Sequence, residues 1–283
     1  MRKTLYVHIT SIVFVASSMV INLYSQNNKT SIDSYLKKKT SEIKSKDKRQ
    51  EYDVTLKWQN LDAINGNKIN CNAVKAAYII GLDNGYVSWK NVSQSQINDF
   101  QQPVSKGTEM PSFNNFSYKA NNTDFLKDDF YKVIPAEQHD LAKWLVSDAI
   151  QMQGLAWYVF DSLSFNKEFR PKLLENYDIK FENWVSFSSR YQKLIWSGIT
   201  KFNNEVCAIV KFESLYNPLE MNTPNMKFKG RSLYWGELWI SLEDKQVEYA
   251  TMVEDVIFEL NLTGNPQKQL LDLQRDVTFT KNR

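Results

Sequence analysis

The sequence predicts an α+β fold, with a curved antiparallel sheet packed on one long helix. Three observations lead to this prediction. Apolar segments separated by turn residues follow one another from Trp184 onward, and a segment of helical periodicity runs over about 135–163. The chain also contains 8 Trp, 14 Tyr and 16 Phe. Aromatic residues favour strands because they pack well on a half-buried pleated surface, so this enrichment indicates sheet.

The helix is predicted to run from about Pro135 to Leu163. Proline suits the first turn of a helix, and the carboxylates of Glu137 and Asp140 favour the positive end of the helix dipole. Gly154 weakens the middle of the helix by about 1 kcal/mol relative to Ala, and could mark a bend or a close contact. A wide apolar stripe predicts packing against a large surface. The stripe consists of Leu141, Leu145, Met152, Leu155, Val159 and Leu163.

Strands are predicted on both sides of this helix. Before it, residues 52–58 and 86–89 predict strands, with a turn at 81–85 between them. Residues 91–130 are rich in Asn and Ser and contain prolines, so we expect a long irregular excursion there. After the helix, the pattern predicts a meander of hairpins with a proline-bounded loop at 218–224. Its strands are expected at 191–202, 205–212, 232–242, 246–253, 256–260 and 270–279, with turns at 203–204, 243–245 and 263–266.

The predicted strand over 232–242 is apolar on both faces, which is typical of a central strand covered on two sides. We expect one face to pack on the helix. The other face needs a loop, a partner or a ligand, and residues 91–130 are the candidate loop. The first face consists of Leu233, Trp235 and Trp239, and the second of Tyr234, Leu238 and Ile240.

Residues 1–25 predict a cleavable signal peptide. Arg2 and Lys3 precede an apolar stretch that ends at Leu23 and is interrupted by polar residues, whereas a membrane span needs roughly 20 predominantly apolar residues. Cleavage is expected after Ser25, and an uncleaved N-terminal anchor is the alternative. We therefore expect an exported protein, periplasmic or secreted, with no transmembrane segment after cleavage. Residues 26–50 are expected to form a charged helical or flexible segment, and residues 51–283 a single domain.

The charge balance argues against a nucleic-acid partner. Loss of Arg2 and Lys3 lowers the 35 basic residues to 33, against 32 acidic residues, and nucleic-acid binders normally carry a basic domain. The one basic cluster, residues 37–49, also contains two acidic residues. It could be a solvated helix or tether, or a patch for phosphate or a membrane surface.

Few residues could support catalysis. His8 leaves with the signal peptide, so a Ser/His/Asp or Cys/His mechanism would have to use His139. The motifs of serine hydrolases and zinc proteases are absent from the sequence, and we expect no metal and no cofactor. Cys71 and Cys207 could form a disulfide in an oxidising compartment, or stay buried as two free thiols.

The hairpin over 238–250, after the hairpin over 199–212, has the order apolar residue, Trp239, Ile240, a turn, Val247 and Ala250. This order resembles the hairpins of periplasmic lipoprotein-carrier proteins and related exported half-barrels. The resemblance covers the last third of the chain. It implies a half-barrel sheet wrapped around a helix, with acyl chains held in the cleft. The position of the helix and the 91–130 excursion depart from the layout of that family, and none of its cleft residues can be matched by position.

Aromatic residues concentrate in the predicted helix and in the C-terminal strands, which predicts an apolar cleft between them. Asp148 lies beside the apolar stripe, where a carboxylate must find a partner or shift its pKa. It could pair with the sheet, or form a polar point in a cavity. We expect non-enzymatic binding of a lipid or other hydrophobic ligand; the alternatives are a cell-envelope interaction module with a filled core and a hydrolase using His139. The candidate cleft residues, each of which could instead be plain core, are Trp144, Asp148, Met152, Trp157, Trp196, Trp235 and Trp239.

Overall fold

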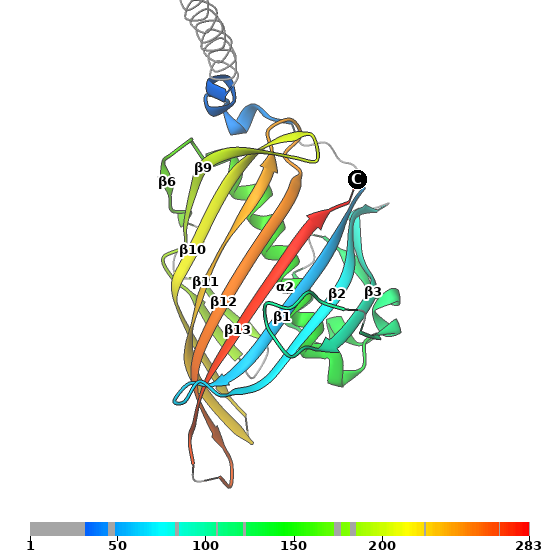
Figure 1. Ribbon diagram of the computed structural model, residues 1–283, viewed down its shortest axis with the longest axis vertical. Coiled ribbons are helices and arrows are strands. Elements are labelled where there is room, and N and C mark those ends of the chain that lie inside the picture. Colours follow the sequence, from blue (N-terminus) through cyan, green and yellow to red (C-terminus); the bar gives the residue numbers. More distant parts are fainter. Residues whose placement is uncertain are drawn as a thin grey trace, which may run out of the picture. The chain divides into compact units, whose positions relative to one another are not determined.

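A computed structural model describes most of the chain after residue 31 (Figure 1). The described residues are 32–44, 49–82, 85–105, 107–120, 123–172, 177–181, 185–223, 225–265 and 267–282. The predicted signal peptide and its cleavage site lie outside them. The chain divides into two compact units, residues 1–39 and residues 40–283. In the first unit, residues 32–36 are helical.

The second unit begins earlier than the predicted boundary at residue 50. The 3-10 helix η1 (Thr40–Glu42) is already part of its core. The Thr40 hydroxyl donates hydrogen bonds to the carbonyl oxygens of Asp161 and Leu163, at 3.2 and 3.1 Å, and Ile43 is buried. These contacts fix η1 beside the end of the helical segment, although its sequence is lysine-rich.

The described part of the second unit contains one 13-stranded sheet in which every strand pairing is antiparallel. This confirms the predicted antiparallel sheet, but the sheet holds far more residues than the helices do. The order is β4-β3-β2-β1-β13-β12-β11-β10-β8-β7; β9 also pairs with β10, β6 with β9, and β5 with β3. The strands are β1 (Gln50–Asp62), β2 (Lys68–Leu82), β3 (Tyr86–Gln96), β4 (Thr108–Glu109), β5 (Ser117–Lys119), β6 (Glu168–Phe169), β7 (Tyr177–Phe181), β8 (Val185–Ser189), β9 (Lys193–Phe202), β10 (Glu205–Asn222), β11 (Met226–Ser241), β12 (Val247–Leu262) and β13 (Gln269–Lys281).

The predicted hairpins are present, and their strands are longer than expected. Asn203 and Asn204 both have positive φ, 48° and 67°, as a two-residue hairpin turn of the right twist requires. The expected break between 253 and 256 is wrong, because β12 continues through it. The expected loop at 218–224 is also wrong. Pro218 lies inside β10, just after a bulge between Ser214 and Asn217, which is a place where a strand tolerates proline.

The predicted long helix is shorter and interrupted. The α-helix α2 covers His139–Gly154, and the helical path continues as the π-helical turn η7 (Leu155–Val159) and the 3-10 turn η8 (Phe160–Ser162). A 3-10 turn, η6 (Ala136–Gln138), precedes it. Gly154 marks the change of helix type, and no atom lies within 4 Å of where its Cβ would be, so it serves no close contact.

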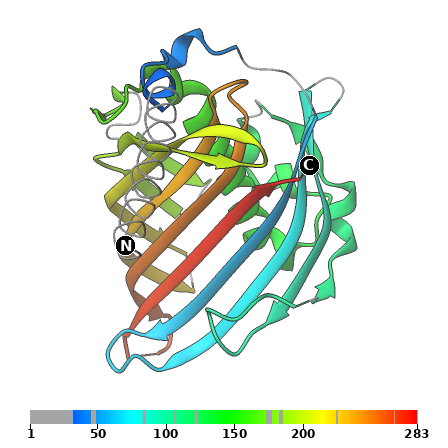
Figure 2. The same ribbon diagram turned by 45° about the horizontal axis from the view of Figure 1, so that its top comes forward.

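The helix α2 lies against one face of the long strands, which we call the inner face (Figures 1 and 2). Side chains alternate between the two faces along a strand, so inner-face residues recur at every second position. Leu145, Ala149 and Met152 of α2 are fully buried, as are Leu56 of β1 and Leu238 of β11. The core therefore lies between α2 and the inner face.

The excursion after β3 does not cover the second face of β11. Its 3-10 turns η3 (Pro111–Asn115), η4 (Asp124–Leu126) and η5 (Asp128–Tyr131) bring together an aromatic cluster that continues the core beside β3. Residues 97–104 instead cover part of the outer face of β2, where Ile97 and Val104 pack against Cys71. The cluster consists of Phe113, Phe116, Tyr118, Phe130 and Tyr131.

Candidate functional site

A buried ionic network joins α2 to the inner face of the sheet. Arg275 of β13 donates two hydrogen bonds of 2.8 Å to the carboxylate of Asp148 on α2, and its Nε donates one of 2.6 Å to Glu254 of β12. The side chains of Arg275 and Asp148 are only 8% and 3% exposed. Ser232 of β11 donates to the second oxygen of Glu254, at 2.6 Å. Asp148 therefore pairs with the sheet, which was one of its two predicted roles.

The electrostatics of this network follow from burial. Burial raises the pKa of the Asp148 carboxyl above its ordinary value, while the Arg275 guanidinium opposes that rise. Two carboxylates surround one guanidinium, so the fully ionised network carries a net negative charge. Burying such a network stabilises the fold only while every member keeps its partner.

Two tryptophans border the network. The Trp144 ring on α2 and the Trp58 ring on β1 meet edge to face, with centroids 5.5 Å apart. The Arg275 guanidinium lies 5.5 Å from the centre of the Trp144 ring, within the range of a cation–π contact. Both rings are half-buried rather than enclosed. A polar group and two partly open aromatic faces thus meet where the helix covers β1 and β13.

Beyond the network, the inner face continues as an apolar surface, which we call the lower apolar strip. Its residues point to the same face of the sheet as Glu254 and Arg275, because side chains alternate along each strand. They are also neighbours across strands: Met221 pairs with Phe228, Phe228 with Leu260, and Phe258 with Leu271. The Phe228 and Phe258 rings lie 4.3 Å apart. All members except Phe258 are only half-buried. The strip consists of Leu219, Met221, Phe228, Phe258, Leu260, Leu271 and Leu273.

The structure does not bring the predicted cleft residues together. Trp144, Asp148 and Met152 lie on α2 toward the inner face, and Trp196 is fully buried on β9, where its ring packs against Phe165. Trp235 and Trp239 lie on the outer face, opposite Val253 and Tyr249. The side chain of Trp157 is outside the described residues. The predicted set therefore divides between two faces of the sheet.

The outer face of β11 carries an aromatic cluster that is open on one side. Trp239 packs against Tyr249, with ring centroids 4.5 Å apart, and against Phe202 at 5.4 Å. Trp235 lies on the same face of β11, four residues before Trp239, and is 38% exposed. Within the described residues, the expected cover on both faces of β11 is therefore complete only on the inner face, around Leu238, and the outer face stays partly open.

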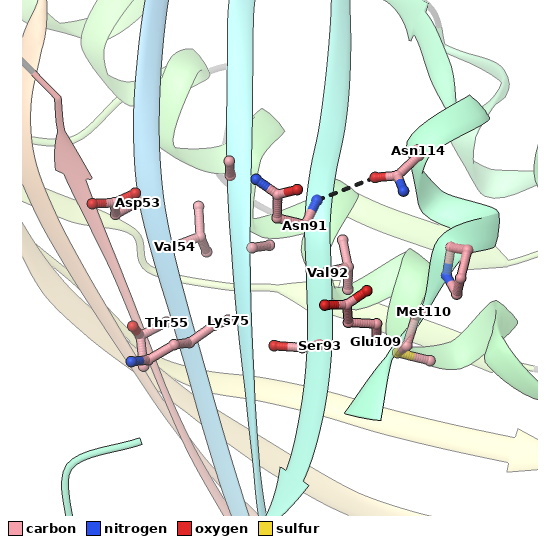
Figure 3. Close-up of a pocket in the computed structure, with 13 residues that line it drawn as sticks. Asp53, Val54, Thr55, Lys75, Asn91, Val92, Ser93, Glu109, Met110 and Asn114 are labelled. Atoms are coloured by element: carbon pink, nitrogen blue, oxygen red, sulfur yellow. Dashed lines mark hydrogen bonds between the residues drawn. The ribbon is translucent and has the colours of Figure 1, made fainter. Parts of the chain in front are cut away.

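A pocket of about 700 Å³ lies on the outer side of β1, β2 and β3 (Figure 3). Asp53 and Thr55 of β1 and Lys75 of β2 form one wall, and Glu109 and Met110 after β3 form the other. The backbone N–H of Asn91 donates to the side-chain oxygen of Asn114, at 3.2 Å, and closes one end. None of the residues that line the pocket in the described structure is a candidate predicted from the sequence. The lining contains both acidic and basic side chains.

His139 has structural contacts at the start of α2. Its Nε2 hydrogen-bonds the carbonyl oxygen of Ile134, at 2.9 Å, and its ring lies 5.9 Å from that of Tyr131. The two cysteines are buried free thiols. Cys71 on β2 and Cys207 on β10 are separated in the sheet by β1, β13, β12 and β11, so the predicted disulfide is wrong and the free-thiol alternative holds. Burial raises the pKa of the Cys207 thiol to about 12.

We expect that His139→Ala leaves the biological activity of the protein unchanged. The ring bonds the carbonyl oxygen of Ile134 and lies beside Tyr131, whose hydroxyl donates to the carbonyl oxygen of Phe125 at 2.7 Å, so neither contact is a nucleophile paired with the ring. Ligand binding and thermal unfolding of the variant should be measured together. A loss of activity at unchanged thermal stability would contradict the expectation and favour the hydrolase alternative.

A second carboxylate pair lies on the outer face of β12 and β13. Asp255 and Asp272 sit diagonally across the strands, and one oxygen of each is buried without a hydrogen-bond donor in the described structure. The other oxygen of Asp272 accepts a hydrogen bond from Gln274, at 2.9 Å. Burial and the neighbouring Asp272 raise the pKa of Asp255 to about 7. The Asp255 carboxyl therefore takes up a proton near neutral pH.

This pair should make stability depend on pH. The Asp255 pKa is higher in the folded chain than its ordinary value of 3.8, so between about pH 4 and pH 7 the folded state holds more protons than the unfolded state. The free energy of unfolding should therefore fall as the pH rises through this interval. We expect Asp255→Asn to raise Tm at pH 8 by about 2–4 °C, a gain of about 1 kcal/mol after allowance for solvent screening, and to leave Tm at pH 4 nearly unchanged.

Differential scanning calorimetry at pH 4, 6 and 8 would measure this effect. Asp53→Asn is the matched control, because Asp53 is an exposed carboxylate on the outer face of β1. An equal change of Tm in both variants, or an unchanged pH slope in Asp255→Asn, would contradict a raised pKa of Asp255 in the folded chain.

No protein-family model matches the chain, and no curated protein matches it. Within the described residues, no group of three or more His, Cys, Asp or Glu is placed to hold a metal ion. Across those same residues, no helix has both the length and the apolar character needed to cross a membrane.

Arg275, Glu254 and the lower apolar strip were missed by the sequence prediction. Arg275 stands between Leu273 and Val277 in the alternation of β13, and a charged residue at an apolar position is a signal that could have found it. The sequence does not single out Phe228, because it lies between Lys227 and Lys229 in a segment without a continuous apolar run.

Proposed function

We propose that the protein binds a hydrophobic or amphiphilic ligand on the inner face of its sheet and catalyses no reaction. The lower apolar strip is the observation that carries this proposal. Under α2, inner-face residues such as Leu56 and Leu238 are fully buried, whereas beyond the ionic network most apolar side chains of the inner face are half-buried. Soluble proteins rarely leave a contiguous apolar surface open unless it binds something. An acyl chain laid along the strip would bury it.

The charges beside the strip favour a ligand with a neutral polar group. Arg275 is already paired with Asp148 and Glu254, so it offers no unbalanced positive charge to a carboxylate or phosphate. The half-buried rings of Trp58 and Trp144 provide flat apolar contacts at the same place. Leu273 is two positions from Arg275 on β13, so the polar group and the strip are next to each other.

We propose that the protein is an exported carrier of such a ligand. A curved, half-barrel-like sheet around α2, and the resemblance of the 238–250 hairpin to lipoprotein carriers, support the same type of binding. We further propose export to the periplasm or outside the cell, with cleavage near Ser25. N-terminal sequencing of exported protein should return a chain that begins near Gln26; a chain that begins at Met1 would contradict cleavage.

Fluorescence anisotropy with labelled lipids tests the ligand. A labelled monoacylglycerol should bind, and the fatty acid of the same chain length should bind more weakly at pH 8 because its carboxylate is ionised. Phe228→Ser should raise the Kd for the monoacylglycerol about thirtyfold, since a buried Phe side chain contributes about 2 kcal/mol. Ile257→Ser is the matched control, because Ile257 is an exposed apolar residue on the outer face of β12.

No binding of either lipid would contradict the proposal, and so would equal weakening in Phe228→Ser and Ile257→Ser. A second candidate, an envelope interaction module, is favoured by the open aromatic cluster around Trp235 and Trp239. Mass spectrometry of small molecules that copurify with the protein separates the two. A bound amphiphile supports the carrier, and its absence together with a flat anisotropy titration supports the interaction module.

A further inference from the structure

Three hairpin turns meet at one end of the sheet. These turns join β1 to β2, β10 to β11, and β12 to β13, and all lie at the lower end in Figure 1. The Ala63 N–H donates to the carbonyl oxygen of Leu270, at 2.9 Å, and the Thr263 N–H donates to that of Asn225, at 3.0 Å. We call this region, residues 62–69, 222–223, 225–227, 261–265 and 267–270, the hairpin end.

Large aliphatic side chains project from the hairpin end. Ile64 is 81% exposed and Ile69 is 56% exposed, and Leu262 and Leu270 are exposed as well. The turn that carries Ile64 is closed by hydrogen bonds. One oxygen of the Asp62 carboxylate accepts a hydrogen bond from the Ile64 N–H, at 2.8 Å, and Gly66 supplies the positive φ of 72° that closes the turn. Isoleucine is a costly residue to expose at the tip of a hairpin, where polar turn residues are usual.

The charge of the hairpin end is positive. Its ionisable side chains are Asp62, Lys68, Lys227 and Lys268, which gives three positive charges and one negative charge. Lys268 is paired with Glu259 just outside the region, at 2.8 Å, so Lys68 and Lys227 supply most of the positive charge. The negative charge of Asp62 is engaged by backbone N–H groups of its own turn. Lysines beside projecting aliphatic residues suit an interface between water and an anionic bilayer, where the apolar side chains enter the acyl region and the ammonium groups stay at the headgroups.

We propose that the hairpin end docks on a lipid bilayer that contains anionic headgroups, with Ile64 and Ile69 inserted below the headgroup level. Separate projecting tips fit a deformable bilayer better than a second folded surface, because a protein partner would need a complementary hole for each tip. The three turns also form the end of the sheet to which the strands of the lower apolar strip run, so docking would bring the strip close to the membrane. The docking itself does not require that the strip binds a ligand.

Vesicle flotation tests this proposal with the chain that begins at Gln26, which contains the whole of the compact unit from Thr40 onward. The protein should float with vesicles of phosphatidylcholine and phosphatidylglycerol in a 7:3 ratio, a test composition of roughly one anionic lipid in three. Binding should be weaker on pure phosphatidylcholine and at high salt, because the lysine contribution is screened. The double variant Ile64→Ser/Ile69→Ser should lower the bound fraction at least about tenfold. Val133→Ser is the control, because Val133 is an aliphatic residue outside the hairpin end whose exposure, 52%, is close to that of Ile69.

Two results would overturn the proposal. One is a wild-type chain that floats with neither vesicle; the other is a double variant that floats as well as Val133→Ser. Concentration-dependent dimers that disappear in the double variant, without flotation of the wild type, would assign the hairpin end to self-association instead. The double variant should keep wild-type affinity for the labelled monoacylglycerol in solution. Failure of membrane docking and failure of ligand binding are therefore separate outcomes.

Discussion

Replacing Arg275 with methionine should lower the free energy of unfolding by about 3–5 kcal/mol at pH 8. Methionine fills a similar volume but leaves the carboxylates of Asp148 and Glu254 without their shared cation. Asp148 is nearly inaccessible to water, so its charge would be buried without compensation. Chemical denaturation followed by tryptophan fluorescence would measure the change.

The same variant should recover stability in acid. Burial already raises the pKa of Asp148, and the opposing effect of Arg275 disappears in the variant, so the folded state would take up a proton at a higher pH than in the wild type. The loss should therefore be smaller at pH 5 than at pH 8. Adding Asp148→Asn to the variant should also restore part of the stability.

Arg170→Met is the control for this experiment. Arg170 pairs with Glu168 at 2.9 Å, but both side chains are about half exposed, so its loss should cost about 0–1 kcal/mol. An equal loss in the two variants, or an Arg275→Met variant as stable as the wild type, would contradict a network that depends on its cation.

Gly236→Ala should lower the free energy of unfolding by about 3 kcal/mol, and Tm by about 6–12 °C. Gly236 lies on the inner face of β11, where a Cβ would collide with the carbonyl oxygen of Thr251 on β12 and approach Phe212 Cζ to 2.8 Å. The backbone of the neighbouring strand cannot move aside without breaking its ladder.

Gly198→Ala is the matched control for that substitution. Gly198 lies on β9, and the nearest atom to its Cβ would be Ile209 Cδ1 at 3.8 Å, an ordinary contact. Thermal unfolding of both variants should show a large change in Gly236→Ala and a small one in Gly198→Ala. Similar Tm values for the two would show that the sheet relaxes around the added methyl group.

The sequence predicts the hairpins well because their signals are local. The pair Asn203 and Asn204 can adopt the positive φ of a tight turn, and apolar residues alternate on both sides of it. The strands were predicted too short because segments such as 226–231 alternate basic residues with half-buried ones. Such segments contain no continuous apolar run that would mark them as strands. The extent of the helix was overestimated since apolar spacing continues past Gly154, where the backbone changes to π and 3-10 turns.

The candidate site could be predicted only in part. Asp148 stood out because a carboxylate beside an apolar stripe needs a partner. Its partner lies on the last strand, and no local pattern connects residues so far apart in the chain. The division of the tryptophans between two faces depended on which face α2 covers, a property of the assembled sheet that alternation alone does not give.

The pairing of β1 with β13 has a consequence for how the chain matures. The first long strand lies in the middle of the sheet and has the last strand as its neighbour, with Val54 opposite Phe279. During synthesis, β1 can form a hairpin with β2 but must wait for the final residues to gain its second partner. Contacts this distant in sequence slow folding. Until β13 has been synthesised, the sheet stays open beside β1, and only then can it close around its centre.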